Sequence, residues 1–447
     1  ADAFLFNSTF ECNPLVIREA IGHGLPILAR NLPQYGDMFT PYITDLKPEK
    51  MKEQLTELLN NKPTYTIPVE QRLQFAQKHI DLYHEVVDKP IQPQEESVTI
   101  VHYFIHEPFL EIRGNSKSKF LVKYFDEQGT CHFDSEIRTN NWVKLNRRWY
   151  TKWNIKVWKD GELYYDYTLN YEGKRVFIAF DSKSLGDTIA WMPYVLEFQK
   201  KHKCKVIVST HKNFLFKDVY PELEFVSPGS RVDNIIGMYT IGWFYNADKE
   251  PELCNTIPLQ KAASNILGLD YQEIKPRIAF TPGENPYGKY IAIATNSTSG
   301  CKFWTKDGWQ LLINFLHEKG YRVINTSQEK NPFEHCEQIE DVSMENTMNV
   351  IHHAHLFIGL SSGLSWLAWA MNKKVVMISN FTDADHEFSC IRIHKEDVCH
   401  GCWNKPQFRF DPGDWNWCPE HKGTDRQFEC HQKIDASQVI FALLGHI

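Results

Sequence analysis

The sequence lacks the features that would point to a membrane span, a nucleic-acid partner or a repeat array. No apolar run approaches the ~20 residues that cross a bilayer, and no secretory signal is recognisable. The net charge of −7 argues against binding to nucleic acid through phosphate contacts. No repeat of solenoid period is evident. What is left is a globular composition, with 42% hydrophobic and 23% charged residues over 447 positions, enough for several domains.

Residues 1–88 are predicted to form a partial α/β segment. A strand at 3–6 precedes a helix that Asn13 caps, and a short buried strand and two further helical segments follow. Residues 89–97 are rich in Pro and Gln and are expected to be a linker. Because the chain opens on Ala1 instead of Met, and almost directly on a strand, we expect a fragment of a longer protein.

Residues 98–172 are predicted to form a small antiparallel β-domain. Apolar and polar side chains alternate there with period two, and Asp160-Gly161 is a strong hairpin signal. Much of the 13% aromatic content falls in this segment.

From residue 173 onward, strands alternate with helices. This rhythm predicts parallel sheets that are covered by helices on both faces. A fresh strand at 290–294 begins a second unit, so we expect two Rossmann-like domains, at 173–285 and 286–447, with a cleft between them.

The first candidate for chemistry is the turn at residues 359–364 (GLSSGL), between a predicted strand and a helix. Its Ser361, Ser362 and Gly363 place free amides at a helix N-terminus, which favours an anion such as a nucleotide diphosphate. The signal is weaker than a Walker loop, and GxGxxG is absent. The alternative is an N-capped helix that packs through Leu364. Gly359, the first residue of the turn, is a further candidate for substrate binding.

The second candidate is the loop at residues 295–304, which follows another strand. Lys302 is placed to reach a phosphate on a departing sugar and to replace a catalytic divalent ion, so none is expected. Thr295 and Ser297 are further candidates for substrate binding. The alternative is an ordinary surface lysine in a polar loop.

The third candidate is Asp187, which closes the motif SKSLGD at the start of a predicted helix. A carboxylate at the mouth of the first sheet can serve as general base for an acceptor hydroxyl, since that hydroxyl acidifies as it attacks. The alternative is that Asp187 is only the N-cap of its helix.

Four cysteines near the C-terminus have the spacing of a metal site. A structural site of this kind holds its ion with four thiolates, and zinc is the first expectation for such ligands. Disulfides are the alternative, but seven other cysteines are scattered without a pairing pattern. The predicted ligands of this metal finger, residues 395–432, are Cys399, Cys402, Cys418 and Cys430. The rival ligands are His400, His421 and His431.

The chain from residue 175 onward resembles the bacterial autotransporter heptosyltransferases, which have the GT-B architecture and are relatives of the lipopolysaccharide heptosyltransferases. The aromatic β-region resembles that family's N-terminal β-region. The resemblance is carried by the cysteine finger and by SLGDTIAW (184–191), PLQKAASNILGL (258–269), CKFW (301–304) and GLSSGLSWLAWAM (359–371).

This resemblance implies a protein O-heptosyltransferase of the bacterial cytoplasm. It would transfer heptose, with inversion, from ADP-glycero-manno-heptose to serine hydroxyls of an autotransporter adhesin passenger domain. Asp187 corresponds to the family's catalytic aspartate, Lys302 to its phosphate-contacting lysine and residues 361–364 to its nucleotide loop. The resemblance also implies iron in the finger, with zinc as the alternative, and a large homo-oligomeric ring. Transfer of another nucleotide sugar and a non-catalytic scaffold stay open as alternatives.

Residues 1–88 resemble something else, the C-terminal end of a retaining GT-B glycosyltransferase. Glu11 and Glu19 match the E-x7-E pair of those enzymes. The acceptor half and the phosphate-binding basic residues of such an enzyme are missing from this chain. We therefore expect two transferases fused in tandem, the first truncated, with Glu11 and Glu19 catalytically idle here.

Overall fold

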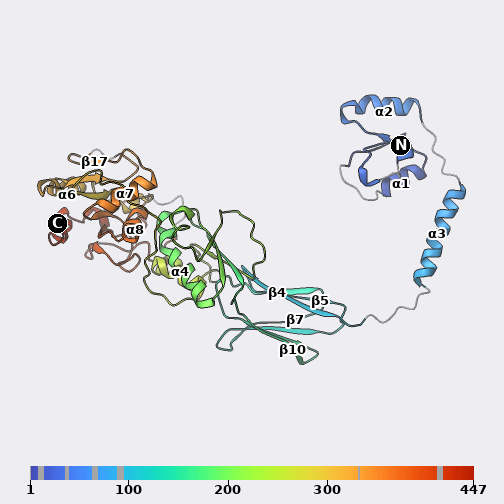
Figure 1. Ribbon diagram of the computed structural model, residues 1–447, viewed down its shortest axis with the longest axis horizontal. Coiled ribbons are helices and arrows are strands. Elements are labelled where there is room, and N and C mark those ends of the chain that lie inside the picture. Colours follow the sequence, from blue (N-terminus) through green and yellow to red (C-terminus); the bar gives the residue numbers. More distant parts are fainter. Residues whose placement is uncertain are drawn as a thin grey trace. The chain divides into compact units, whose positions relative to one another are not determined.

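The computed structural model describes residues 2–8, 15–35, 40–62, 69–87, 95–330, 333–409 and 416–447. The chain divides into two compact units, residues 1–95 and 96–447 (Figure 1). We refer to them as the N-terminal unit and the C-terminal unit. No helix among the described residues combines the length and apolarity that crossing a bilayer demands.

The N-terminal unit contains a short parallel sheet in the order β1-β2-β3. One face of α1 and the strand β2 supply most of its buried side chains, so the apolar spacing of the helix explains its packing. Glu19 lies on the exposed side of α1, whereas Glu11, Asn13 and residues 89–94 of the predicted linker lie outside the described residues. The elements are β1 (Phe4–Phe6), α1 (Leu15–Gly22), β2 (Ile27–Ala29), β3 (Thr44–Asp45), α2 (Met51–Asn60) and α3 (Val69–Val87).

The C-terminal unit begins with a seven-stranded sheet in the order β13-β12-β11-β14-β4-β5-β8. Its first four strands are parallel, as the α/β rhythm predicts. They are β11 (Arg175–Phe180), β12 (Lys205–Ser209), β13 (Glu224–Phe225) and β14 (Gly237–Ile241). The helices of this part, which we name the first lobe, are α4 (Leu185–His202) and α5 (Leu259–Leu267).

The predicted antiparallel region is continuous with that sheet. β4 (Val98–Ile105) pairs antiparallel with β5 (Phe109–Gly114), while its last two residues pair in parallel with β14. β5 in turn pairs with β8 (Asn141–Lys144). The strand β4 is long enough to serve both partners, so it covers an edge of β14 that would otherwise be open. A separate domain over 98–172 therefore stays a prediction, although the antiparallel strands are present.

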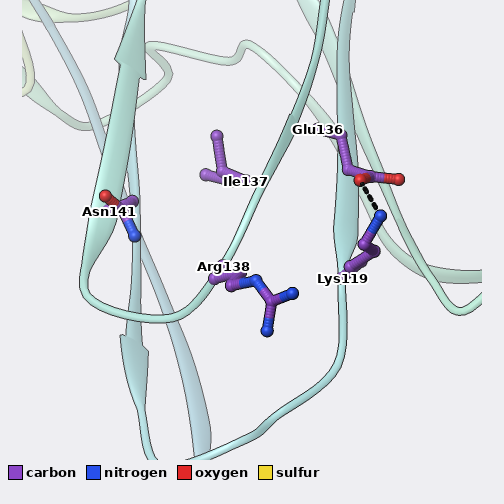
Figure 2. Close-up of a pocket in the computed structure, with 5 residues that line it drawn as sticks. All are labelled: Lys119, Glu136, Ile137, Arg138 and Asn141. Atoms are coloured by element: carbon purple, nitrogen blue, oxygen red, sulfur yellow. Dashed lines mark ion pairs between the residues drawn. The ribbon is translucent and has the colours of Figure 1, made fainter.

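Four further strands of this region form a second antiparallel sheet, in the order β10-β9-β6-β7. They are β6 (Phe120–Phe125), β7 (Cys131–Ile137), β9 (Asn154–Lys159) and β10 (Glu162–Thr168). Asp160 and Gly161, both with positive φ, turn β9 into β10 as the sequence predicts. A hollow of about 240 Å³ lies beside β6, β7 and β8. Figure 2 shows its lining residues, among them Lys119 and Glu136, which form an ion pair at 2.7 Å.

The second lobe is a six-stranded parallel sheet in the order β17-β16-β15-β18-β19-β20. Its strands are β15 (Tyr290–Ala294), β16 (Arg322–Asn325), β17 (Glu337–Gln338), β18 (Phe357–Leu360), β19 (Val375–Ile378) and β20 (Ile391–Ile393). Its helices are α6 (Lys306–Glu318), α7 (Met344–His353), α8 (Gly363–Ala370), α9 (Glu429–Gln432) and α10 (Ala436–Leu443). One apolar core runs from the first lobe through α4 and α8 to one face of this sheet, so the lobes pack directly on each other.

Candidate active site

Two helices from different lobes meet at their N-termini. α4 follows β11 and α8 follows β18, so each helix begins at the carboxyl end of a parallel strand. A Cβ on Gly363 would lie 2.9 Å from the Cβ of Leu185 and 3.1 Å from the amide nitrogen of Gly186. Only glycine permits this approach. Because each helix N-terminus carries partial positive charge and unpaired N–H groups, the junction favours an anion.

The predicted nucleotide turn supplies one side of the junction. Ser362 is the N-cap of α8 but makes no side-chain capping bond, and its buried Oγ has no partner among the described residues. Leu364 packs against the core. Gly359 lies inside β18, where a Cβ would meet Phe357 and Ser365. The turn therefore combines packing with a hydroxyl that is available to a ligand.

Lys302 brings the second predicted loop to this turn. It ends the short helix η6 (Gly300–Lys302), and its Nζ donates to the carbonyl oxygen of Ser361 at 3.0 Å and lies 3.4 Å from the Ser361 Oγ. Lys302 is therefore half-buried and held against the turn, and its role at a phosphate stays a prediction.

Asp187, from the first lobe, lies near Lys302 and the 359–364 turn. Its Oδ2 accepts hydrogen bonds from the Ser182 Oγ at 2.6 Å and from the Trp243 Nε1 at 2.8 Å. Its side chain is buried, with the residue 8% exposed, and burial raises the pKa of Asp187. The two hydrogen bonds and the nearby Lys302 ammonium offset only part of that increase. The N-cap of α4 is Ser184, so the alternative in which Asp187 caps the helix is wrong.

Thr295 and Ser297 lie at the carboxyl end of β15 within a local hydrogen-bond network. The Thr295 amide donates to the Ser327 Oγ at 2.8 Å, and the Thr295 Oγ1 accepts from the Asn325 Nδ2 at 3.2 Å. The Ser297 Oγ accepts from the Ser299 amide at 3.4 Å. Their roles in substrate binding stay predictions.

Sequence reasoning missed two residues that support this site. Trp243 follows β14 and Glu387 follows β19, so both obey the rule that functional groups gather at the carboxyl ends of parallel strands. Glu387 accepts from the Ser361 hydroxyl and pairs with Arg392 at 2.6 Å. Burial raises the pKa of Glu387, but the charge of Arg392, together with His386 and these hydrogen bonds, outweighs burial and lowers it to about 2.

The first lobe also contains a hollow of about 200 Å³. Asp181, one of its lining residues, immediately precedes Ser182 in the chain. The lining residues are His106, Arg148, Asp181, Thr240, Phe244 and Lys249. Asp181 and Phe244 are the chain neighbours of Ser182 and Trp243, which bond Asp187, so this hollow is a candidate place for the approach of a second substrate.

The four cysteines of the finger lie near enough to one another to interact electrostatically. Burial raises the pKa of the Cys430 thiol, and the charges of the other three finger cysteines raise it further. Thiols that oppose one another's ionisation in this way are stabilised as thiolates by a cation, so the donor set fits a metal. Within the described part of the chain, the only three or more such donors that come within 4.8 Å of one another are those of Cys399, His421 and Glu429. This trio is a rival ligand set, and coordination by the four cysteines stays a prediction.

Comparison with known proteins assigns the family. Residues 260–410 match glycosyltransferase family 9 (heptosyltransferase). The autotransporter heptosyltransferase Aah of Escherichia coli is 34% identical over 343 residues, which are 72% of this chain and 88% of Aah. The chain belongs to the autotransporter heptosyltransferase family. This confirms the resemblance drawn from its motifs and makes it a glycosyltransferase of that family.

A solved member of the autotransporter heptosyltransferase family supports the fold. The structure of TibC, an iron-containing dodecameric glycosyltransferase from enterotoxigenic E. coli H10407, has a TM-score of 0.72 and 28% identity, and the match covers 79% of this chain and 95% of TibC. A second TibC structure, in complex with ADP-D-β-D-heptose, has a TM-score of 0.71 at 29% identity, over 79% of this chain and 98% of TibC. BimC of Burkholderia thailandensis, described as an inactive autotransporter heptosyltransferase, is 30% identical over 69% of this chain and 77% of BimC.

Proposed function

We propose that this chain transfers heptose from ADP-glycero-manno-heptose to serine hydroxyls of an autotransporter adhesin in the bacterial cytoplasm. The observation that carries the proposal is the convergence of Asp187, Lys302 and the 359–364 turn from three separate segments. Membership of the family and the ADP-heptose complex of TibC support this choice of donor.

The donor diphosphate would bind where the two helix N-termini meet. The amides of Ser362 and Gly363, the unpartnered Ser362 hydroxyl and the Lys302 ammonium would contact its oxygens. As the bond from the anomeric carbon to the phosphate breaks, negative charge develops on ADP. Lys302 would stabilise that charge, so no catalytic divalent ion is needed.

Asp187 would act as general base. The serine hydroxyl attacks the anomeric carbon on the side opposite to ADP and gives its proton to the Asp187 carboxylate, so the configuration inverts. The raised pKa suits this role, because a base whose pKa approaches the operating pH takes a proton more readily. We place the approach of the acceptor in the hollow next to Asp181.

The finger would hold a structural iron ion through Cys399, Cys402, Cys418 and Cys430, with zinc as the alternative. Four protein ligands close a tetrahedral site and leave no position for substrate, so the metal's contribution would be to fix the fold of residues 395–432. The iron content and the dodecameric state of TibC support iron here and a large homo-oligomer. We expect the N-terminal unit, with its exposed Glu19, to take no part in the reaction.

A second candidate is a non-catalytic scaffold, which is favoured by the existence of BimC, a relative described as inactive. Measurements of donor binding and of turnover distinguish the enzyme from the scaffold. The purified chain is incubated with ADP-heptose, a UDP-sugar or a GDP-sugar, and thermal stability and transfer to a serine-rich passenger peptide are measured.

The proposal predicts that ADP-heptose at 100 times its Kd stabilises the chain by ~2.7 kcal/mol and supports transfer. Asp187→Asn should bind the donor as the parent does and lose activity by about 100-fold or more, whereas the exposed Asp218→Asn should match the parent. A chain that no nucleotide sugar stabilises and that transfers nothing would be a scaffold. Stabilisation by a UDP- or GDP-sugar instead of ADP-heptose would show that the donor is a different sugar nucleotide.

A further inference from the structure

The finger contacts the first lobe through a buried asparagine. Asn255, which is fully buried, donates from its Nδ2 to the carbonyl oxygens of Trp403 at 3.0 Å and Lys405 at 3.1 Å. In return, the Asn404 Nδ2 donates to the Asn255 carbonyl oxygen at 2.9 Å. These bonds fix the first half of the finger to the loop that precedes α5.

The same finger is fixed to the second lobe. The Gly401 amide donates to the carbonyl oxygen of Asn380 at 2.8 Å, and the Asn380 Nδ2 donates to the carbonyl oxygen of Cys430 at 2.9 Å. The Asn416 Oδ1 accepts from the amide of Gly300 at 3.1 Å, two residues before Lys302. One short segment therefore bonds to both lobes and to the lysine loop.

Trp403 extends this connection to Asp187. Its ring meets the ring of Trp243 edge-on, with centroids 5.1 Å apart and an interplanar angle of 85°. Two more rings lie against Trp243, His386, stacked at 6.3 Å, and Trp191 at 6.0 Å. With its ring held from these sides, Trp243 directs its Nε1–H at the Asp187 carboxylate.

We infer that the finger is a clasp between the lobes that orients the catalytic carboxylate, with Trp403 holding Trp243 and Trp243 holding Asp187. In this arrangement Trp243 and Trp403 are positioning residues. The inference rests on the proposed role of Asp187 and adds a function for the finger beyond stabilising its own fold.

The clasp has a consequence for the pH dependence of the reaction. The charged group that faces Asp187 is Lys302. The titratable groups packed around Trp243 are His386, whose pKa burial lowers to about 4, the Cys301 thiol, whose pKa burial raises, and Cys402 of the finger. His386 is thus neutral near pH 7, and Lys302 remains in every variant below. The indole N–H of Trp243 stabilises the ionised form of Asp187, so its loss raises the pKa of Asp187.

The test compares full-length variants in the transfer assay, with kcat and the donor KM measured from pH 5 to 9. Trp243→Phe retains a ring but removes the N–H. The acid limb of the plot of kcat against pH should therefore move to higher pH by about one unit, while the donor KM should change less than about twofold. Trp403→Leu should move the limb in the same direction, and Trp403→Phe, which keeps an aromatic edge, should restore it. Metal content is measured for both Trp403 variants, and each should retain its ion.

Trp153→Leu is the matched control. Trp153 is also buried and packs edge-on against another ring, that of Tyr124 at 6.1 Å, but it belongs to the antiparallel region. Trp153→Leu should lower the free energy of unfolding without moving the acid limb of the kcat profile. An unshifted limb in Trp243→Phe, beside an inactive Asp187→Asn, overturns the clasp and leaves the proposed function standing. An active Asp187→Asn overturns both.

Discussion

A Cβ added to Gly363 would stand 3.1 Å from the backbone nitrogen of Gly186, so α8 and α4 leave no room for a methyl group at their crossing. The two nearest atoms, the Leu185 Cβ and the Gly186 nitrogen, cannot rotate away. The crossing thus fixes the anion-binding junction at the level of the main chain.

Gly363→Ala is therefore expected to lower stability by about 1–3 kcal/mol and to weaken donor binding. Unfolding in urea is followed by tryptophan fluorescence, which reports on the C-terminal unit because all 13 tryptophans lie there. Gly445→Ala is the control, since a Cβ at Gly445 meets nothing within 4 Å. Parent-like stability and affinity in Gly363→Ala would show that the helices separate readily.

Lys302→Met is expected to raise the donor KM by about 10–100-fold, because a charge-assisted contact worth ~1.5–3 kcal/mol is lost. The acid limb of kcat should also move to higher pH, since the Lys302 charge lowers the pKa of Asp187 and favours its ionised form. The exposed Lys306→Met makes the same change of charge four residues away and should leave both quantities unchanged. A normal donor KM in Lys302→Met would remove Lys302 from the phosphate site.

Glu250 is expected to make the protein less stable as the pH rises. It is 1% exposed, and neither carboxylate oxygen has a hydrogen-bond partner among the described residues. Burial, with a smaller contribution from Glu252, raises the pKa of Glu250 to about 9. The folded state then holds a proton that the unfolded state releases above pH 4.5, so stability falls between pH 4.5 and 9.

Glu250→Gln removes this dependence and should stabilise the chain at pH 7 by up to about 3 kcal/mol. Urea unfolding at several pH values measures both effects. The exposed Glu284→Gln should keep the slope of the parent protein. An unchanged slope in Glu250→Gln would mean that Glu250 is ionised in the folded state.

The metal content of finger variants distinguishes the two ligand sets. If four cysteines bind the ion, Cys402→Ser should lose it, while His421→Asn should keep about one ion per chain. Elemental mass spectrometry of the purified proteins gives the stoichiometry. Loss of metal in His421→Asn, with retention in Cys402→Ser, would assign the site to Cys399, His421 and Glu429 instead.

The elements and loops that could be predicted are those marked by short sequence patterns. The strand–turn–helix order around Lys302 and residues 359–364 follows from short patterns, and the carboxyl-end rule then places both loops at one edge of a sheet. The meeting of Lys302 with Ser361 is a tertiary contact, but this rule anticipated it.

The remainder depends on partners that are distant in the sequence. β4 joins β14 across more than a hundred residues, and alternation within β4 carries no signal for that pairing. Trp243 resembles a core aromatic until its N–H is seen to reach Asp187. Glu387 resembles a surface acid until Arg392 is seen beside it. Each of these roles is defined by a contact, and a single sequence does not list contacts.

The measurement that tests the proposed function most directly is the intact mass of a serine-rich adhesin passenger domain co-expressed with this chain. The passenger is expected to gain mass in steps of one heptose, and to gain none when the chain carries Asp187→Asn. A passenger that stays unmodified with the parent chain, gains steps of a different sugar, or is modified equally by Asp187→Asn would contradict the account.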